Sequence, residues 1–334
     1  MRSVRLDGDS KVRVVEAPEP APGPGQVVVR ALVSALCGSE LKGYRGTGAS
    51  DGNSGHEGMG VVHAVGEGVT AVAVGDRVGV SAIAGCGRPA CPQCQRGQST
   101  WCPDRAYFGS MHAEYFLTRA TACLPVPEDV PDEAAVLLAG DGLGVPYHTS
   151  RKLAEGTRTV AVFGLGPVGL GNVLLQAHLG REVIGVDLQP YRLDRARQLG
   201  AAAAVHAGEE DAVAAVLEHT GGAGADVAIE AAGRVETARQ CFAAVRTAGT
   251  VVFNGEQPSL EVSPSEDFIR RDITAVGSWF FHVGEFAAML ELYRGGLRVA
   301  DLVSHVVPLA EAAAAYDLFA SGATAKVLLD MRGA

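Results

Sequence analysis

The sequence predicts an irregular β-rich domain followed by an α/β domain built on a doubly wound parallel sheet. Two observations lead to this fold class. Up to about residue 140, short apolar runs are broken by glycine and proline, which is typical of β-strands joined by turns. From residue 159, apolar runs alternate with helical patterns, as expected of repeated βαβ units.

In the β-rich part, strands are expected at 12–16, 26–35, 58–65 and 75–80. The proline-rich stretch 17–25 is interpreted either as a linker or as a polyproline-type connection inside one domain, and we favour the connection. No domain boundary is therefore expected there.

In the α/β part, strands are expected at 159–164, 182–187, 225–233 and 249–255, with helices beginning at Pro167, Tyr191 and Val235. A further strand is expected at 273–279. Helical patterns then cover 285–293 and 309–319, and the apolar run 326–330 is the last expected element.

The composition is that of an ordinary globular protein. The chain has 334 residues, 47% of them hydrophobic, so apolar burial can offset the loss of chain entropy, and two or three folding units are expected. The net charge of −10 argues against nucleic-acid binding through bulk charge. The sequence has neither a secretory signal pattern nor an apolar run of about 18 residues, so we expect a cytoplasmic protein without a membrane segment.

A glycine-rich turn follows the strand at 159–164. Gly164, Gly166 and Gly169 form a G-x-G-x-x-G pattern that opens a helix at Pro167 and Val168. The first two glycines permit a tight turn and the close approach of a pyrophosphate, and the third lets helix and strand pack closely. The helix N-terminus offers N–H groups and a positive dipole end to the phosphates.

Asp187 ends the next strand at about the offset where a carboxylate accepts hydrogen bonds from a ribose diol. Because a carboxylate repels a 2′-phosphate, NAD is predicted in preference to NADP. Arg192 lies close by and would pack on the adenine or face solvent. A glycine-rich turn without a ligand is the alternative interpretation, and Asp187 argues against it.

Four cysteines gather in one loop: Cys86, Cys91, Cys94 and Cys102. Four thiolates are the ligands of a closed, tetrahedral structural zinc site, and the glycines and prolines between them let the backbone fold around an ion. A chance cluster of cysteines is the alternative. The spacing favours metal over disulfides in a long chain that looks cytosolic.

A sparser set consists of Cys37 in Cys-Gly-Ser-Glu, His56 in Gly-His-Glu and Asp141 in Gly-Asp-Gly. A catalytic zinc takes about three protein ligands of S, N and O type and keeps one position open. Sequence spacing alone does not show that the three converge, and a buried core cysteine is an equally good interpretation of Cys37. The other histidines, His112 among them, are expected to be surface or packed residues.

The order of these motifs resembles that of the zinc-dependent medium-chain alcohol dehydrogenase family over essentially the whole chain. The resemblance implies a GroES-like catalytic domain at 1–145 and 282–334, with a structural zinc lobe at 85–103. It implies a Rossmann NAD-binding domain at 146–281, two zinc ions per chain, and a homodimer or homotetramer in which the strand at 273–279 pairs between subunits.

The resemblance also assigns roles residue by residue. Cys37, His56 and Asp141 match the catalytic zinc ligands, although members carry cysteine, aspartate or glutamate at the position of Asp141. Glu57 matches the acid beside the histidine, which orients or briefly replaces a ligand. Ser39 matches the hydroxyl that hydrogen-bonds the substrate alcohol and passes its proton outward.

The chain departs from the family pattern at several positions. Lys42 stands where many members have a histidine that completes the proton relay, so Lys42 would instead contact the cofactor or solvent, and Glu40 stands where aspartate is usual. Where polyol dehydrogenases tend to carry an arginine, the chain has Phe280 and Phe281. This difference favours a less polar substrate pocket, and the aromatic residues available to line it are Tyr44, Trp101, Phe108, Phe280 and Phe281.

The resulting hypothesis is an alcohol dehydrogenase in which zinc at Cys37, His56 and Asp141 binds the alcohol oxygen and the hydride passes to NAD. A secondary alcohol or ketone is the expected small-molecule substrate, and polyols, amino alcohols and primary alcohols stay open. A catalytically silent protein that binds NAD and zinc is the alternative function. A zinc-independent enone reductase is disfavoured by Asp187 and the four-cysteine loop.

Overall fold

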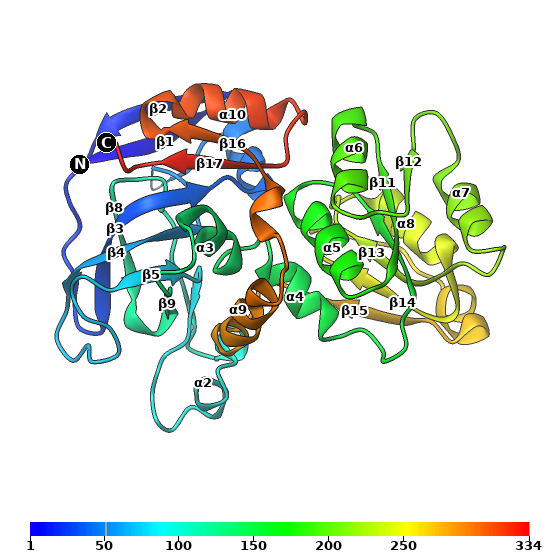
Figure 1. The fold of residues 1–334 in the computed structure, drawn as a ribbon, viewed down its shortest axis with the longest axis horizontal. Coiled ribbons are helices and arrows are strands. Elements are labelled where there is room, and N and C mark those ends of the chain that lie inside the picture. Colours follow the sequence, from blue (N-terminus) through cyan, green and yellow to red (C-terminus); the bar gives the residue numbers. More distant parts are fainter. Residues whose placement is uncertain (51, 334) are drawn as a thin grey trace. The chain divides into compact units, whose positions relative to one another are not determined.

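The computed structural model describes residues 1–50 and 52–333, which form two compact units (Figure 1). One unit comprises Met1–Gly144 and Phe280–Ala334, and the other comprises Val145–Trp279. The chain therefore leaves the first unit, builds the second, and returns to the first.

The first unit is built on a seven-stranded sheet in which distant parts of the chain pair. Its order is β16-β17-β3-β4-β5-β9, with β8 also paired to β3. The β16–β17 pair is parallel and the other pairs are antiparallel. The strands are β3 (Gln26–Ala35), β4 (Gly58–Val65), β5 (Arg77–Val80), β8 (Tyr115–Arg119), β9 (Cys123–Pro125), β16 (Val303–Pro308) and β17 (Lys326–Asp330).

Smaller elements complete the first unit. A hairpin of β1 (Arg2–Gly8) and β2 (Lys11–Glu16) and a short pair of β6 (Ile83–Ala84) and β7 (Ala106–Tyr107) lie outside the large sheet. The helices are α1 (Leu41–Arg45), α2 (Pro92–Gln95), α3 (Asp132–Leu138), α9 (Phe286–Arg294) and α10 (Ala312–Ala320).

Helix α10 joins the main core of this unit. Its buried residues recur at helical spacing, namely Ala312, Ala315, Tyr316 and Phe319, so one face of the helix is apolar. These side chains pack in one cluster with Val27 and Val29 of β3. The C-terminal part of the chain is therefore held against the strand that leads to Cys37.

The second unit contains a parallel sheet of order β12-β11-β10-β13-β14-β15. Its strands are β10 (Thr159–Phe163), β11 (Glu182–Asp187), β12 (Ala203–His206), β13 (Ala225–Glu230), β14 (Val245–Phe253) and β15 (Thr274–Gly277). Its helices are α4 (Gly144–Ser150), α5 (Pro167–His178), α6 (Pro190–Gln198), α7 (Ala212–His219) and α8 (Val235–Ala244).

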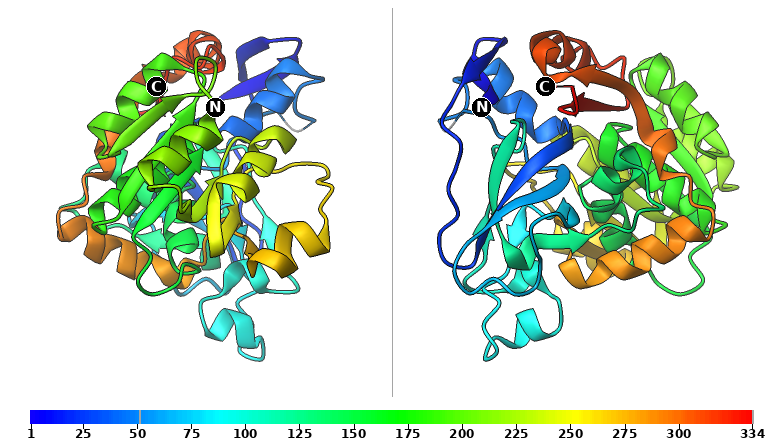
Figure 2. Two further views of the ribbon diagram at one scale, coloured as in Figure 1. Left: turned by 90° about the vertical axis from the view of Figure 1, so that its right-hand side faces the viewer. Right: turned by 60° about the vertical axis from the view of Figure 1, so that its left-hand side comes forward.

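Four of the five helices of the second unit form two packed pairs, α5 with α6 and α7 with α8, against the sheet (Figure 2, left). Strands β10 and β13 are buried nearly throughout, as expected where helices cover both faces of a parallel sheet. The strand order reverses between β10 and β13, and ligands of such sheets bind at the carboxyl ends of the strands near this point.

The structure confirms the predicted fold class and most predicted strands, and it corrects several elements. β5 begins at Arg77 rather than at 75, and β15 covers only Thr274–Gly277. The elements that were not predicted are β1, β6, β7, β8, β9, β12, β16, α1, α2, α3, α4 and α7. Most of them have five residues or fewer, which is too short for a periodic pattern. Residues 17–25 connect β2 to β3 within the first unit.

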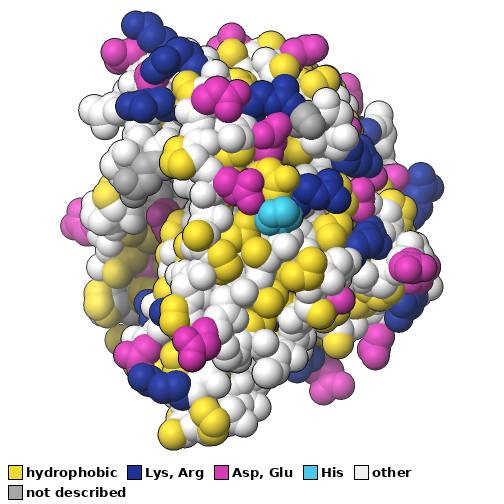
Figure 3. Space-filling view, turned by 90° about the vertical axis from the view of Figure 1, so that its left-hand side faces the viewer, with side chains coloured by type: hydrophobic (Ala, Val, Ile, Leu, Met, Phe, Trp, Pro, Cys, Tyr) yellow, Lys and Arg dark blue, Asp and Glu magenta, His cyan; other side chains and the backbone are white. Residues whose placement is uncertain are grey.

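The surface bears mixed charge. On the face drawn in Figure 3, acidic and basic side chains alternate among apolar ones, and no continuous basic patch is visible among the described residues. No helix in the part of the chain that the structure describes is long and apolar enough to cross a membrane.

Candidate metal and cofactor sites

The structure brings Cys37, His56, Glu57 and Asp141 together inside the first unit. Cys37 follows β3, the His56–Glu57 pair precedes β4, and Asp141 follows α3. One ligand atom from each of the four lies within 4.8 Å of all the others. The Asp141 Oδ2 atom is 3.1 Å from His56 Nε2 and 3.7 Å from Cys37 Sγ. Three segments that are distant in the sequence therefore converge on one point.

The chemistry of this cluster fits a divalent cation. All four residues are buried, and the set offers sulfur, nitrogen and oxygen donors, which is the ligand set that zinc takes. Burial lowers the pKa of His56, but Cys37 and Asp141 outweigh it and hold that pKa well above its usual value. Cys37 and Asp141 thus favour a positive charge at the centre of the cluster, which a divalent cation would supply.

The orientation of His56 is fixed by a backbone carbonyl. Its Nδ1 atom lies 2.9 Å from the Ser54 carbonyl oxygen, so Nδ1 carries a proton and donates. Nε2 then faces Asp141, in the orientation that a metal-ligating histidine needs.

Glu57 forms a fully buried ion pair with Lys326 of β17. The Lys326 ammonium also donates to the Leu36 carbonyl oxygen at 3.2 Å, next to Cys37. The other carboxylate oxygen of Glu57 accepts from the Gly142 N–H at 3.3 Å, next to Asp141. Burial lowers the pKa of Lys326, but Glu57 outweighs it and raises that pKa above its usual value, so the ammonium stays charged.

Three residues of the turn after Cys37 differ in environment. Ser39 is exposed in the 3₁₀ turn Gly38–Glu40, and Lys42 is exposed in α1. Glu40 is buried and accepts from the Cys37 N–H at 2.8 Å. Burial raises the pKa of Glu40, but the neighbouring His112 outweighs it and lowers that pKa to about 2.

The four cysteines of the loop also converge. The ligand atoms of Cys86, Cys91, Cys94 and Cys102 lie within 4.8 Å of one another. None of the seven cysteines, all of which lie in the described part of the chain, forms a disulfide. Four thiols at this separation match a closed tetrahedral zinc site rather than a pair of bridges.

The glycine-rich turn of the second unit has the expected backbone. Gly164 has a φ of +91°, which disfavours other residues, and a Cβ at Gly169 would lie 1.9 Å from the Gly164 carbonyl oxygen. A Cβ at Gly166 would meet nothing within 4 Å, so this side of the turn is open. Gly166 caps α5, and Pro167 and Val168 are its first residues.

Asp187 is bound to the glycine-rich turn. Its carboxylate accepts from the backbone N–H groups of Leu165, Leu188 and Gln189 at 2.6, 2.8 and 2.9 Å. About four lone-pair sites are available on a carboxylate, so capacity for a further donor remains. The Arg192 guanidinium lies 3.9 Å from the same carboxylate.

Of the aromatic residues considered for the substrate pocket, the structure places Phe280 beside His56, one of the candidate metal ligands. The Phe280 ring stands edge-on to His56 with centroids 6.0 Å apart, and Tyr107 lies 6.3 Å from Phe280. Phe280 adopts a φ of +52°, a strained conformation that is found at ligand-binding positions. Tyr44 and Phe281 are instead buried in the core, and Trp101 packs on His282.

Sequence reasoning missed two residues of the site. Lys326 lies in an apolar run near the end of the chain, and Tyr107 follows the cysteine loop. A lysine inside an otherwise buried strand was the available signal, because a buried charge needs a partner. No pattern in the sequence indicated that Tyr107 lies in the site.

Two models of known protein families match this chain. The model described as "Zinc-binding dehydrogenase" matches residues 167–295, and the model described as "Alcohol dehydrogenase GroES-like domain" matches residues 23–128. An uncharacterized zinc-type alcohol dehydrogenase-like protein, YphC of Escherichia coli K12, is 31% identical, with 99% of this chain and 98% of that protein covered. An L-threonine 3-dehydrogenase of Symbiobacterium thermophilum is also 31% identical, with 98% and 97% covered.

Several solved structures of dehydrogenases share the fold of this chain. Alcohol dehydrogenase TADH from Thermus sp. ATN1 superimposes with a TM-score of 0.87 at 30% identity, covering 99% of each chain. A structure described as a short chain alcohol dehydrogenase of E. coli CFT073, in complex with NADH, gives a TM-score of 0.85 at 26% identity, covering 99% of each chain. A structure described as a "putative zinc-binding dehydrogenase" of Sinorhizobium meliloti 1021, bound to NADP, gives a TM-score of 0.83 at 26% identity, covering 98% of each chain.

Proposed function

The chain belongs to the zinc-dependent medium-chain alcohol dehydrogenase family, and from this premise we propose that it oxidises a secondary alcohol to a ketone with NAD, or catalyses the reverse reduction. It is an oxidoreductase that acts on alcohols with zinc and a nicotinamide cofactor. The observation that carries the proposal is the buried convergence of Cys37, His56 and Asp141 on one point.

The reaction converts an alcohol and NAD⁺ into a ketone, NADH and a proton. Held by Cys37, His56 and Asp141, a zinc ion would supply Lewis acidity toward the hydroxyl or carbonyl oxygen, and bound NAD would supply a hydride acceptor. Ser39, exposed on the turn that carries Cys37, would accept the hydroxyl proton and pass it to solvent. Glu57 pairs with Lys326 and accepts from the Gly142 N–H, and through these contacts it would keep the turns around Cys37 and Asp141 in place.

We assign the cofactor to the glycine-rich turn and Asp187. Gly164, Gly166 and Gly169 with the first turn of α5, at Pro167 and Val168, would bind the pyrophosphate, because N–H groups at a helix N-terminus bind anions. Asp187 would bind the ribose diol and disfavour a 2′-phosphate, which supports NAD over NADP. Arg192 would pack at the adenosine end.

The substrate assignment rests on the aromatic residues beside the ligands. Phe280 and Tyr107 present apolar surface next to His56, so the pocket favours an alcohol with an apolar substituent over a polyol. Kinetic comparison of an apolar secondary alcohol with a polyol and with L-threonine tests this assignment. A higher kcat/KM for the polyol or for L-threonine would contradict it.

We further propose that the four-cysteine loop holds a second, structural zinc, and that the enzyme works in the cytoplasm. Seven free cysteines, five of them in the two candidate metal clusters, support a reducing compartment.

The first experiment is the zinc content per chain together with turnover. We expect about two zinc ions in the wild type and about one in Cys37→Ser and in Cys91→Ser. Cys37→Ser loses turnover but keeps NADH binding, because the cofactor residues lie in the second unit. Cys123 is a buried cysteine outside both clusters, so Cys123→Ser is the matched control and should keep two zinc ions per chain.

Two outcomes would contradict the proposal. Full activity of Cys37→Ser would remove the metal from the mechanism. Two zinc ions without turnover of any alcohol or ketone would favour the catalytically silent alternative.

A further inference from the structure

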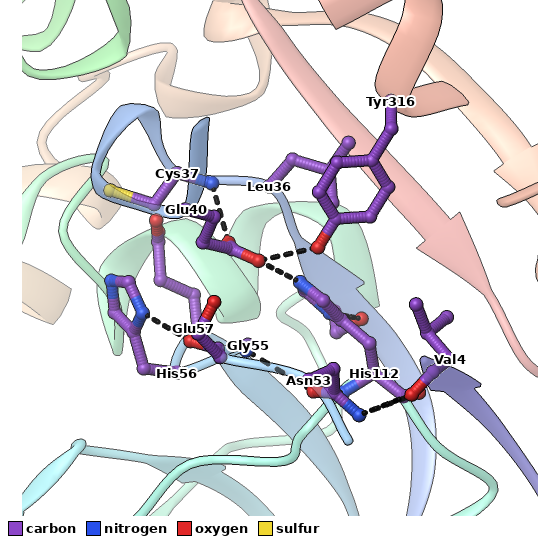
Figure 4. Close-up of polar contacts among 12 residues, drawn as sticks. Val4, Leu36, Cys37, Glu40, Asn53, Gly55, His56, Glu57, His112 and Tyr316 are labelled. Atoms are coloured by element: carbon purple, nitrogen blue, oxygen red, sulfur yellow. Dashed lines mark hydrogen bonds and ion pairs between the residues drawn. The ribbon is translucent and has the colours of Figure 1, made fainter. Parts of the chain in front are cut away.

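A buried polar network lies behind the Cys37–His56–Asp141 cluster. Glu40, His112 and Tyr316 (Figure 4) form it together with Ser34. All four residues are at most 2% exposed. The Glu40 carboxylate lies 2.9 Å from His112 Nε2 and accepts from the Tyr316 hydroxyl at 2.6 Å. Because an ionised carboxylate only accepts, His112 Nε2 must donate.

Glu40 connects this network to the first ligand. Its second carboxylate oxygen accepts from the Cys37 N–H at 2.8 Å, which closes the turn directly after β3. A single carboxylate therefore binds the Cys37 backbone, a histidine from another segment, and a tyrosine from α10.

His112 connects the same network to the second ligand. Its ring packs so closely on Gly55 that a Cβ there would lie 2.6 Å from the imidazole, and Gly55 directly precedes His56. The Asn53 side chain accepts from both the Gly55 N–H at 3.1 Å and the His112 N–H at 3.2 Å. The Gly55 carbonyl oxygen accepts from the Met111 N–H at 3.0 Å, so the two segments are bound at several points.

The burial of the network limits what it can do. Ser34 Oγ lies 2.7 Å from His112 Nδ1, so serine, histidine and carboxylate follow one another as in a hydrolytic triad. Ser34 and His112 are 0% exposed, and no substrate can reach the hydroxyl. The network instead contacts the backbone segments that carry Cys37 and His56, two of the proposed zinc ligands.

We propose that Glu40, His112 and Tyr316 are positioning residues that hold the Cys37 turn and the His56 turn at the spacing a zinc ion requires. This inference rests on the proposed function, because it presupposes zinc at these ligands. Side chains behind metal ligands typically change metal affinity about 10–100-fold when they are replaced. Here they act on the backbone of the ligand turns rather than on the ligand side chains.

The chain offers a matched pair of variants for the test. Tyr316 and Tyr44 are stacked with ring centroids 5.7 Å apart, and the Tyr44 hydroxyl donates to Asp317 instead of Glu40. Tyr316→Phe therefore removes one hydroxyl from the network, whereas Tyr44→Phe removes one from the same packing environment but outside the network. Glu40→Gln tests the central carboxylate with little change of shape.

The measurement is the rate of zinc transfer from the holoenzyme to a chromogenic chelator, with the phase that belongs to the four-cysteine loop identified from Cys91→Ser. We expect Glu40→Gln to release the zinc at Cys37 and His56 about tenfold faster or more, with the loop zinc unchanged. Tyr316→Phe accelerates the same phase to a smaller degree, and Tyr44→Phe leaves both phases as in the wild type.

Either of two results would overturn the inference: release from both sites at wild-type rates in Glu40→Gln, or equal acceleration by Tyr44→Phe and Tyr316→Phe. If Glu40→Gln fails to fold, the rates of zinc release of Tyr316→Phe and Tyr44→Phe test the inference by themselves. A wild type that releases zinc from the loop site only would refute the proposed function as well, and this is seen before any variant is compared.

Discussion

At the scale of single residues, Lys326 shows how the end of the chain reaches the candidate zinc site. Its ammonium pairs with Glu57 and bonds to the carbonyl before Cys37, and both side chains of the pair are fully buried. Removing one member of such a pair leaves an uncompensated buried charge, which typically costs about 3–5 kcal/mol.

Lys326→Met is therefore expected to lower the free energy of unfolding by about 3–5 kcal/mol, measured by urea denaturation of the metal-free protein. The double variant with Glu57→Gln should recover much of this loss, because no charge is then left unpaired. Arg294→Met, which removes an exposed pair with Asp129, serves as the control and should cost less than about 1 kcal/mol. Equal losses at both pairs would contradict the buried-charge argument.

We propose that the preference between NAD and NADP depends on Asp187. Asp187→Asn removes the negative charge that would repel a 2′-phosphate, so the ratio of NADH to NADPH affinity should fall about tenfold, or about 1.4 kcal/mol. A displaced glycine-rich turn would weaken both cofactors alike, so the ratio isolates the charge. Titration calorimetry measures both affinities. Asp194→Asn, on the exposed side of α6, should leave the ratio unchanged.

At the scale of elements, one carboxylate joins the starts of β10 and β13. Asp226 accepts from the backbone N–H groups of Arg158 and Thr159 at 2.8 and 2.9 Å and pairs with Arg246. Burial raises the pKa of Asp226, but Arg246 and the two N–H groups outweigh it and lower that pKa to about 2. Since the unfolded value is ~3.9, the ionised form stabilises the folded chain above about pH 4.

Asp226→Asn should thus lower the free energy of unfolding by about 1–2 kcal/mol at neutral pH. The difference from the wild type should shrink as the pH falls from about 4 to about 2, because the wild-type carboxylate then becomes protonated. Urea denaturation over this pH range measures both effects. A difference that stays constant with pH would exclude the charge of Asp226 as its cause.

At the scale of the whole molecule, the second sheet ends in a strand with an available edge. β15 pairs with β14 on one side only among the described strands, and Ile269, in the turn that leads into it, is 69% exposed. An open edge beside apolar surface favours pairing with a second chain. We propose a homodimer or homotetramer that uses this edge.

Light scattering should accordingly give two or four times the chain mass of 34.5 kDa. Ile269→Arg should lower the oligomeric fraction, because it places a charge on the exposed apolar turn that precedes β15. Arg270→Ala, next to it in an exposed ion pair with Glu266, is the control. A wild type with the mass of one chain would refute the assembly.

The fold class, the glycine-rich turn and the four-cysteine loop are predictable from the amino-acid sequence, because each depends on residues that are neighbours in the chain. Strand and helix periods are local, and so is the spacing of Gly164, Gly166 and Gly169. The tertiary structure alone decided what converges from distant segments. It brings Asp141 to Cys37 and His56, pairs Lys326 with Glu57, and makes His112 part of a network rather than a merely packed residue. The physical reason is that a buried polar group takes whichever partner the packing of separate elements brings to it, and no local pattern encodes that choice.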